Sequence, residues 1–393
     1  MATARAGDDA AACPVAAAGR AGVGAEPDGS GRAGGRRRSV YDLSECVPLW
    51  GRATTRGRRN AMEDACAAVP PFADVPVRML ASARKLDALG RAGVDDASAA
   101  MHLFGVYDGH GGSEVANYCG DRIHVVLREA LGRAAAARGL SGELGGIQEL
   151  WEKAFCECFQ RVDDEVSGEA SRFMLAGGVS EARYEPVAAH DVGSTAVVAL
   201  VCSSHVIVAN CGDSRVVLCR GKEPMALSVD HKPDRQDERA RIEAAGGHVV
   251  NWHGHRVEGV LAMSRSIGDR YIKPFIIPKP EVRVVPRTNG DDCLILASDG
   301  LWDVISNEDA CKAARLKILR WHEKNDGTCF SEGGEPTISD PASQAAAAYL
   351  VRLALRKGSK DNITVIVIDL KRRKMIKDKT AQDGQRYSSE FRA

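Results

Sequence analysis

The chain has 393 residues, of which 44% are apolar and 27% charged, and its formal net charge is zero. This size and composition predict a globular protein with a full core, and the neutral charge excludes a chain-wide electrostatic attraction to nucleic acid or membrane. No apolar stretch approaches the roughly 20 residues that a membrane-spanning helix needs.

Composition divides the chain into three parts. Residues 1–43 are rich in Ala, Gly and Arg and lack a compact apolar segment, which predicts a disordered tail rather than a secretory signal. Residues 44–372 have a mixed composition, and we expect them to form one domain. Residues 373–393 form a polar, basic tail. The basic run at 371–374 is either a nuclear import signal or a solvated run of charges.

Periodicity predicts both strands and helices in the central part. We expect helices where apolar residues recur at helical spacing, strands where short apolar runs occur, a surface insertion at 70–100 and a polar loop at 321–341. The strands are at 101–107, 194–201, 205–210, 215–220, 293–298 and 363–370, and the helices are at 113–137, 148–166, 302–319 and 342–356. The three runs between 194 and 220 are typical of antiparallel hairpins. Runs of strands followed by runs of helices favour an α+β fold.

Twelve cysteines are spread along the chain, mostly within apolar runs, and no Cys-x-x-Cys pair occurs. This distribution predicts reduced, buried thiols in an intracellular protein, with neither a disulfide framework nor a zinc site.

Carboxylates stand at the ends of several predicted strands. Asp108, Asp213 and Asp299 each end an apolar run beside a glycine, and Asp361 precedes one. Two further acids, Glu63 and Asp64, follow an arginine-rich turn. Because strand ends of one sheet layer lie close together, we expect these acids to meet at one edge.

Such a group of acids has two interpretations. Buried carboxylates need partners, and oxygen ligands without a Cys/His cluster favour Mg²⁺ or Mn²⁺ over zinc. The competing interpretation of each Asp-Gly pair is an ordinary turn residue, which is its usual role. Turns alone explain one such pair more easily than the whole set.

Two basic side chains near these acids suit phosphate chemistry. Arg59, four residues before Glu63, has the bidentate geometry that phosphate binding favours, unless it is only a surface arginine. His110 follows Asp108 closely and suits protonation of a leaving group, unless it is only a turn residue bonded to backbone.

Eight motifs follow one another along the chain: RNAMEDA at 59–65, FGVYDGHGGS at 104–113, GSTA at 193–196, NCGDSR at 210–215, DHKP at 230–233, SRSIGD at 264–269, SDGLWD at 298–303 and GSKDN at 358–362. In these motifs and in their order the sequence closely resembles the metal-dependent Ser/Thr protein phosphatases of type 2C. The motifs are specific together, although no one of them is specific alone.

The resemblance implies an α-β-β-α sandwich of two antiparallel sheets flanked by helices. It implies that Asp108, the Gly109 carbonyl, Asp299 and Asp361 hold two or more Mg²⁺ or Mn²⁺ ions, with Arg59 on the substrate phosphate. It places Glu63, Asp64 and Asp213 nearby, on metal-bound waters or a weaker third metal. The implied reaction is a single step in which a hydroxide activated by two cations attacks phospho-Ser/Thr, and His110 or a metal-bound water protonates the leaving oxygen.

The sequence is closer still to the plant group, clade A, that represses abscisic acid signalling. Residues 48–51, 246–252, 261–264 and 269–271 carry this narrower resemblance. It implies that hormone-bound receptors of the START-like type inhibit the enzyme by contacting Trp252, Gly111 and the edge at Glu63. From residues alone, Trp252 is better explained as a partly buried core tryptophan. Glu258 stands where this group usually has a hydrophobic residue.

The resemblance also suggests sucrose-non-fermenting-related kinases as substrates, and location in nucleus and cytoplasm. We expect a monomer that binds neither nucleic acid nor membrane. Two other functions compete: a catalytically weak module that binds kinase or receptor, and a metal nuclease. The intact acid set argues against the first, and the lack of a basic stripe with aromatic residues argues against the second.

Overall fold

The computed structural model describes residues 48–80, 98–140, 146–169, 185–325 and 339–371. The predicted tails, 1–43 and 373–393, lie outside the described residues, so the domain boundaries remain predictions. No helix among the described residues is long and apolar enough to cross a membrane.

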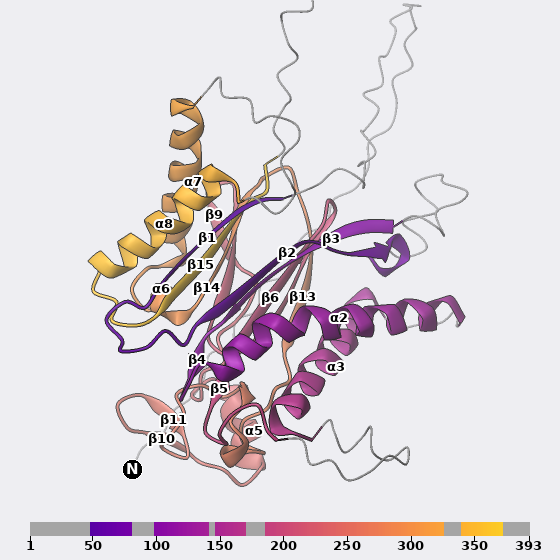
Figure 1. Cartoon of the computed structure of the whole chain (residues 1–393), viewed down its shortest axis with the longest axis vertical. Helices are drawn as coiled ribbons and strands as arrows, with labels where there is room; N and C mark the ends of the chain where they lie inside the picture. Colours follow the sequence, from indigo (N-terminus) through magenta and orange to yellow (C-terminus); the bar gives the residue numbers. More distant parts are fainter. Residues whose placement is uncertain (1–47, 81–97, 141–145, 170–184, 326–338, 372–393) are drawn as a thin grey trace, which may run out of the picture. The chain divides into compact units, whose positions relative to one another are not determined.

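Two five-stranded antiparallel sheets stack face to face (Figure 1). The first has the order β1-β15-β14-β8-β9, with β1 at Leu49–Thr55, β15 at Ile363–Asp369, β14 at Asp291–Ala297, β8 at Arg215–Arg220 and β9 at Glu223–Ala226. The second has the order β13-β7-β6-β3-β2, with β13 at Glu281–Pro286, β7 at His205–Cys211, β6 at Ala196–Val201, β3 at Ser98–Tyr107 and β2 at Ala65–Pro76.

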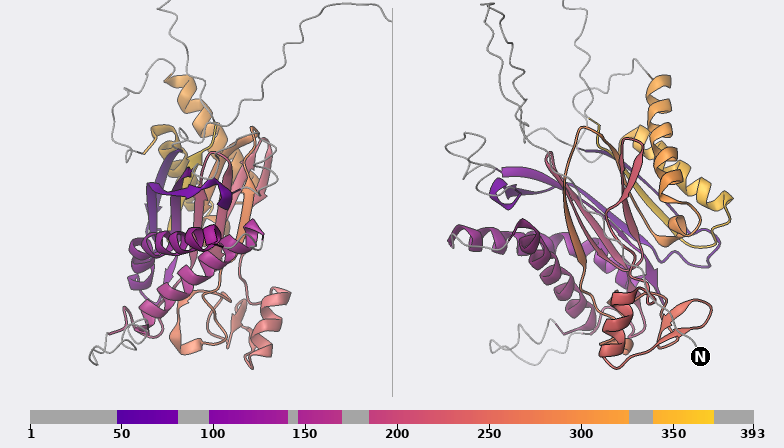
Figure 2. Two further views of the ribbon diagram at one scale, coloured as in Figure 1. Left: turned by 90° about the vertical axis from the view of Figure 1, so that its right-hand side faces the viewer. Right: turned by 180° about the vertical axis from the view of Figure 1, so that it is seen from behind.

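Helices cover the outer face of each sheet (Figure 2). Helices α2 (Glu114–Leu140) and α3 (Ile147–Ser167) pack on the second sheet, and α6 (Asp299–Trp302), α7 (Asn307–Lys324) and α8 (Pro341–Arg356) pack on the first. The predicted α-β-β-α sandwich of the α+β class is thereby confirmed.

Alternation along each strand separates the inner core from the outer ones. In β3, Phe104 and Val106 face the other sheet, whereas Met101 and Leu103 face α2 and α3. Both sets are fully buried because both faces of the strand are covered, which is why apolar residues occupy most positions of β3. Each such side chain contributes about 1.5–3 kcal/mol of burial free energy.

Smaller elements extend from one end of the sandwich. A three-stranded sheet has the order β12-β5-β4, with β12 at Ile267–Gly268, β5 at Gly193–Ser194 and β4 at Gly109–His110. A hairpin joins β10 (Val249–Asn251) to β11 (His255–Val257). The remaining elements are α5 (Gln236–Ala244) and the short 3-10 helices η1 (Val77–Met79) and η3 (Arg270–Ile272).

Several local predictions were wrong. Strand β8 does not pair with β7: it belongs to the other sheet, where it pairs with β14 and β9. The predicted insertion at 70–100 starts too early, because β2 continues to Pro76 past a register shift at Pro70 and Pro71 and buries Phe72 and Val75.

The predicted helix at 302–319 is in fact α6 and α7. Ser306 lies between the two helices and is the N-cap of α7, because its side chain accepts a hydrogen bond from the backbone N–H of Asp309 at 3.2 Å. Helix α7 then continues to Lys324, so the polar loop predicted at 321–341 begins later than expected, and residues 326–338 lie outside the described part.

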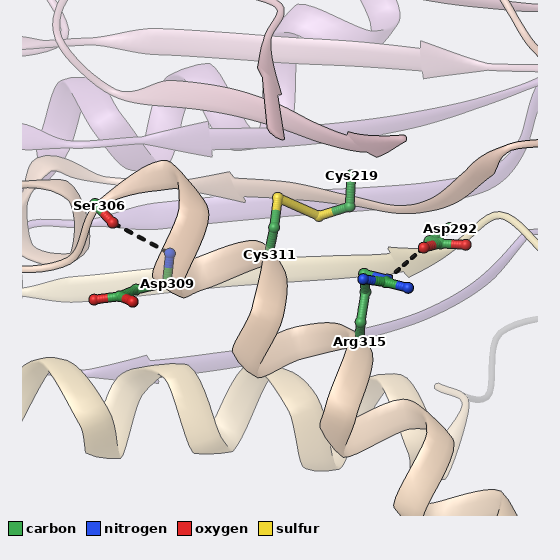
Figure 3. The surroundings of a disulfide bond; sticks show 6 residues. All are labelled: Cys219, Asp292, Ser306, Asp309, Cys311 and Arg315. Atoms are coloured by element: carbon green, nitrogen blue, oxygen red, sulfur yellow. Dashed lines mark hydrogen bonds and ion pairs between the residues drawn. A yellow bond between two sulfur atoms is a disulfide. The ribbon is translucent and has the colours of Figure 1, made fainter. Parts of the chain in front are cut away.

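The cysteine prediction was also wrong at one pair. Cys219 on β8 and Cys311 on α7 form a disulfide with 5.5 Å between their Cα atoms (Figure 3). The residues are 92 positions apart, and neither lies in a recognisable spacing motif. An ion pair between Arg315 and Asp292 lies nearby on the same helix–sheet interface.

Candidate active site

The predicted acids gather at one end of the stacked sheets. Asp64 precedes β2 and Asp108 follows β3, and the register pairs the adjoining residues Ala65 and Tyr107. From the other sheet, Ser298 donates a hydrogen bond to Oδ2 of Asp64 at 2.9 Å, although the two residues are 234 positions apart. The strand ends therefore lie close together, as expected, and they come from both sheets.

Strong mutual repulsion marks the buried carboxyls of this cluster. Burial raises the pKa of Asp108 well above its usual range, and the charges of Asp64, Asp299, Asp213 and Asp361 raise it further. Burial raises the pKa of Asp64 to about 6. Burial, followed by the charges of Asp213, Asp303 and Asp361, raises the pKa of Asp299 to about 8. Such shifts are typical of functional sites.

Two basic side chains, Lys232 and Arg59, neutralise part of the negative charge of the cluster. Lys232 Nζ lies 2.5 Å from Oδ2 of Asp213, and Arg59 lies 2.6 Å from Oδ2 of Asp361. The Arg59 side chain is 53% exposed, so its guanidinium reaches solvent at the edge of the site. The Arg59–Asp361 pair joins segments 302 positions apart, whereas Lys232 and Asp213 are 19 positions apart.

The donor set fits a hard divalent cation. Oδ1 of Asp64 and Oδ1 of Asp213 are buried and accept no hydrogen bond within the described residues. Buried anionic oxygens without partners are costly, and a divalent cation offsets that cost. Within the same residues, no three acidic, histidine or cysteine groups already surround one point at coordination distance. The fit therefore rests on charge and donor chemistry.

His110 lies beside this cluster and is engaged by a carboxylate. Its Nε2 is 2.8 Å and 2.9 Å from the two oxygens of Asp269. Burial lowers the pKa of His110, but the hydrogen bond and charge of Asp269, followed by the charges of Asp213 and Glu63, more than offset this and raise it.

Of the residues predicted to contact a receptor, Trp252 and Gly111 lie on exposed loops, and Glu63 is partly buried. The Trp252 side chain, at the tip of the β10–β11 hairpin, is 64% exposed, so the expectation of a partly buried core tryptophan was wrong. Gly111 has a φ of +73°, and a Cβ added there would lie 2.6 Å from the Asp191 carbonyl oxygen. Glu258 turns back onto its own hairpin, where its carboxylate accepts the backbone N–H of His248.

Three polar partners of the site were not predicted from the sequence. Lys232 and Asp269 lie in the DHKP and SRSIGD motifs, but nothing in their spacing shows which acid or histidine they contact. Asp303 stands four residues after Asp299, one helical turn away, and burial raises its pKa. That i, i+4 spacing was the one usable signal.

Comparison with known proteins defines the class. The family described as "Protein phosphatase 2C" matches residues 53–363. Protein phosphatase 2C 50 of Oryza sativa subsp. japonica is 65% identical over 360 residues, covering 91% of this chain and 92% of the relative. Protein phosphatase 2C 16 of Arabidopsis thaliana is 54% identical over 347 residues, covering 87% of this chain and 65% of the relative.

The fold comparison agrees. The crystal structure of serine-threonine phosphatase 2C from Toxoplasma gondii matches with a TM-score of 0.58 at 22% identity, covering 83% of this chain and 96% of that one. The chain belongs to the protein phosphatase 2C family. It is accordingly a protein serine/threonine phosphatase of a family that depends on Mg²⁺ or Mn²⁺.

Proposed function

We propose that Asp108, the Gly109 carbonyl, Asp299 and Asp361 hold two or more Mg²⁺ or Mn²⁺ ions. Asp64, Asp213 and Glu63 hold waters around them or a weaker third ion. The observation that carries the proposal is the gathering of buried, mutually repelling carboxyls from both sheets at one end of the sandwich. Bound cations supply a more acidic water and neutralise charge on the phosphoryl oxygens.

The chain's own residues orient the substrate. Arg59 reaches solvent at the edge of the cluster, where its planar guanidinium binds two oxygens of a phosphoserine or phosphothreonine. His110 protonates the departing seryl or threonyl oxygen. Because most acids of the cluster are buried, the exposed side of the site remains accessible to the phosphorylated segment of the substrate.

The proposal is tested by phosphate release from a phosphoserine peptide with added Mg²⁺ or Mn²⁺, with EDTA as the reversal. Asp108→Asn and Asp299→Asn are expected to lower both turnover and Mn²⁺ binding measured by calorimetry. Asp121→Asn, an exposed acid on α2, is the matched control and leaves both unchanged. Turnover that survives EDTA contradicts the metal assignment, whereas metal binding without turnover favours the catalytically weak binding module.

We further propose that this phosphatase represses abscisic acid signalling and is inhibited by hormone-bound receptors of the START-like type. The support is the exposed apolar surface of the hairpin region, where Trp252, Val250 and Val260 are 64%, 43% and 51% exposed. Exposed apolar residues gathered in one region are typical of interaction sites. The substrates proposed are sucrose-non-fermenting-related kinases, and the location is nucleus and cytoplasm.

Trp252→Ala tests the receptor proposal. The variant is expected to lose hormone-dependent inhibition by a panel of receptors while keeping its turnover of a small phosphopeptide. Val229→Ala, another exposed apolar residue at 58% but outside the hairpin, serves as control. Inhibition of the Trp252 variant at the wild-type receptor concentration refutes the assigned contact.

A further inference from the structure

A turn at the edge of the acid cluster carries more basic side chains than a single phosphate contact needs. The turn follows β1 and contains Arg56, Arg58 and Arg59, all of which are exposed. Lys360, which directly precedes Asp361, is exposed as well. Arg59 is the proposed phosphate contact, so the other three basic residues have no role in the site described above.

Buried contacts hold this turn against the segment that leads into β15. The side-chain amide of Asn362, a residue that is 3% exposed, donates to the carbonyl of Arg56 at 2.8 Å and to that of Ala61 at 3.0 Å. Gly57, which lies between two of the arginines, has a φ of +62°, and a Cβ there would overlap the carbonyl oxygen of Asp361. The fold therefore fixes the turn and its arginines beside an acid of the cluster.

The positive charges of this turn are largely uncompensated. Arg59 pairs with Asp361, whereas Arg56, Arg58 and Lys360 form no ion pair with any acid that the structure describes. Arg56 instead donates from Nη1 to the carbonyl of Asn60 at 3.3 Å. Like charges held close together repel one another, and an anion that binds among them relieves the repulsion. Because the net charge of the chain is zero, this attraction for anions is local.

We propose that Arg56, Arg58 and Lys360, here called the basic cluster, bind an anionic side chain close to the phosphorylated residue of the substrate. This inference rests on the proposed function, because it takes Arg59 as the contact of the substrate phosphate. In an extended peptide, side chains two positions apart lie on one face at a spacing of about 7 Å. An acid two positions from the phosphoserine thus comes within reach of the basic cluster. Its ligand is a carboxylate or a second phosphoryl group, since both suit a planar guanidinium.

Matched phosphopeptides test the inference. One carries glutamate two residues before and after the phosphoserine, and the other carries glutamine at the same positions. With Mn²⁺ at low ionic strength, the wild type is expected to have a kcat/KM about fivefold higher on the glutamate peptide, mainly through KM, because each exposed charge pair contributes a factor of a few. In the double variant Arg56→Ala/Arg58→Ala this ratio is expected to fall to about one to two.

Arg320→Ala is the matched control. Arg320 is an exposed arginine on α7, and it also forms no ion pair with a described acid. Its variant removes one positive charge, as Arg58→Ala does, and is expected to keep the wild-type ratio. Arg58→Glu is expected to reverse the preference, so that a peptide with lysine at the two positions becomes the better substrate. Equal kcat/KM of the wild type on the glutamate and glutamine peptides, or an equal loss in Arg320→Ala, overturns the inference.

Peptide binding without turnover separates the two sources of negative charge. In fluorescent peptides, a phosphonate that cannot be hydrolysed replaces the phosphoserine, and the flanking positions carry glutamine, glutamate or a second phosphonate. Fluorescence anisotropy with Mn²⁺ measures their affinities. Tighter binding of the glutamate peptide alone identifies a carboxylate as the ligand, tighter binding of the second-phosphonate peptide alone identifies a phosphoryl group, and tighter binding of both identifies either anion.

Each gain in affinity is expected to disappear in the double variant and to persist in Arg320→Ala. Equal affinity of the wild type for all three peptides overturns the inference, as does a gain that survives in the double variant. A wild type that prefers the anionic peptides but releases no phosphate from any phosphopeptide with Mn²⁺ instead refutes the proposed function. The two failures are therefore distinguishable.

Discussion

Replacing Asp299 by Asn is expected to stabilise the protein in chelator at neutral pH. The ordinary pKa of an aspartate is 3.8, and burial raises that of Asp299 to about 8. At pH 7 the unfolded carboxyl is therefore ionised while the folded one retains its proton. The cost to the folded state is set by the difference between the unfolded pKa of 3.8 and the solution pH of 7, which at 1.36 kcal/mol per pH unit is about 4 kcal/mol.

The sign follows from the raised folded pKa. The carboxyl's contribution to stability is fully present below pH 4 and is lost as the pH rises toward 8. Because the charges of Asp213 and Asp303 contribute to the raised pKa of Asp299, the expected gain of the asparagine variant at pH 7 is about 2–4 kcal/mol, and at pH 5 it falls to about 1.5 kcal/mol or less.

Urea unfolding in EDTA at pH 5 and pH 7 measures both values. Asp121→Asn, on the exposed face of α2, is expected to change neither. An Asp299→Asn variant that is no more stable than wild type at pH 7, or that gains equally at both pH values, contradicts the raised pKa of Asp299. Added Mn²⁺ is expected to reverse the order by stabilising the wild type alone.

Two other predictions concern a loop and the disulfide. Gly111 has a φ of +73° and lies against the Asp191 carbonyl, so Gly111→Asp is expected to lower kcat/KM on a phosphopeptide by about tenfold or more. Gly132→Asp, in open space on α2, is the control and leaves kcat/KM unchanged. Equal activity of the two variants contradicts this prediction. Reductant is expected to lower wild-type stability by about 2–5 kcal/mol, because the bond between Cys219 and Cys311 closes a long loop. A variant with both cysteines replaced by Ala is expected to be insensitive to reductant, and a wild type equally insensitive refutes the pairing.

Strand ends and their acids were predictable because they depend on local pattern. Continuous apolar runs locate β3 and β14, and the adjoining Asp108 and Asp299 follow directly. Partners across the fold were not predictable in this way. Strand β8 is apolar on both faces, so its pattern fits either sheet, and only its pairing with β14 and β9 shows which one it joins.

The same limit applies to the site. Arg59 and Asp361 were each named from sequence, but their ion pair spans 302 positions. Asp269 was named only as part of the SRSIGD motif, and its contact with His110 depends on the missing side chain of Gly193. The disulfide was missed because Cys219 and Cys311 have no motif spacing. In each case the decisive information is a distance between remote segments.

The position of β15 has a consequence for synthesis of the protein. This last described strand lies inside its sheet, between β1 and β14, and Asp361 immediately precedes it. Until β15 has emerged from the ribosome, the facing edges of β1 and β14 are unpaired, and the acid cluster lacks Asp361. Pairing of strands that are far apart in the sequence slows folding, and a chain truncated before Asp361 lacks one of the proposed metal ligands.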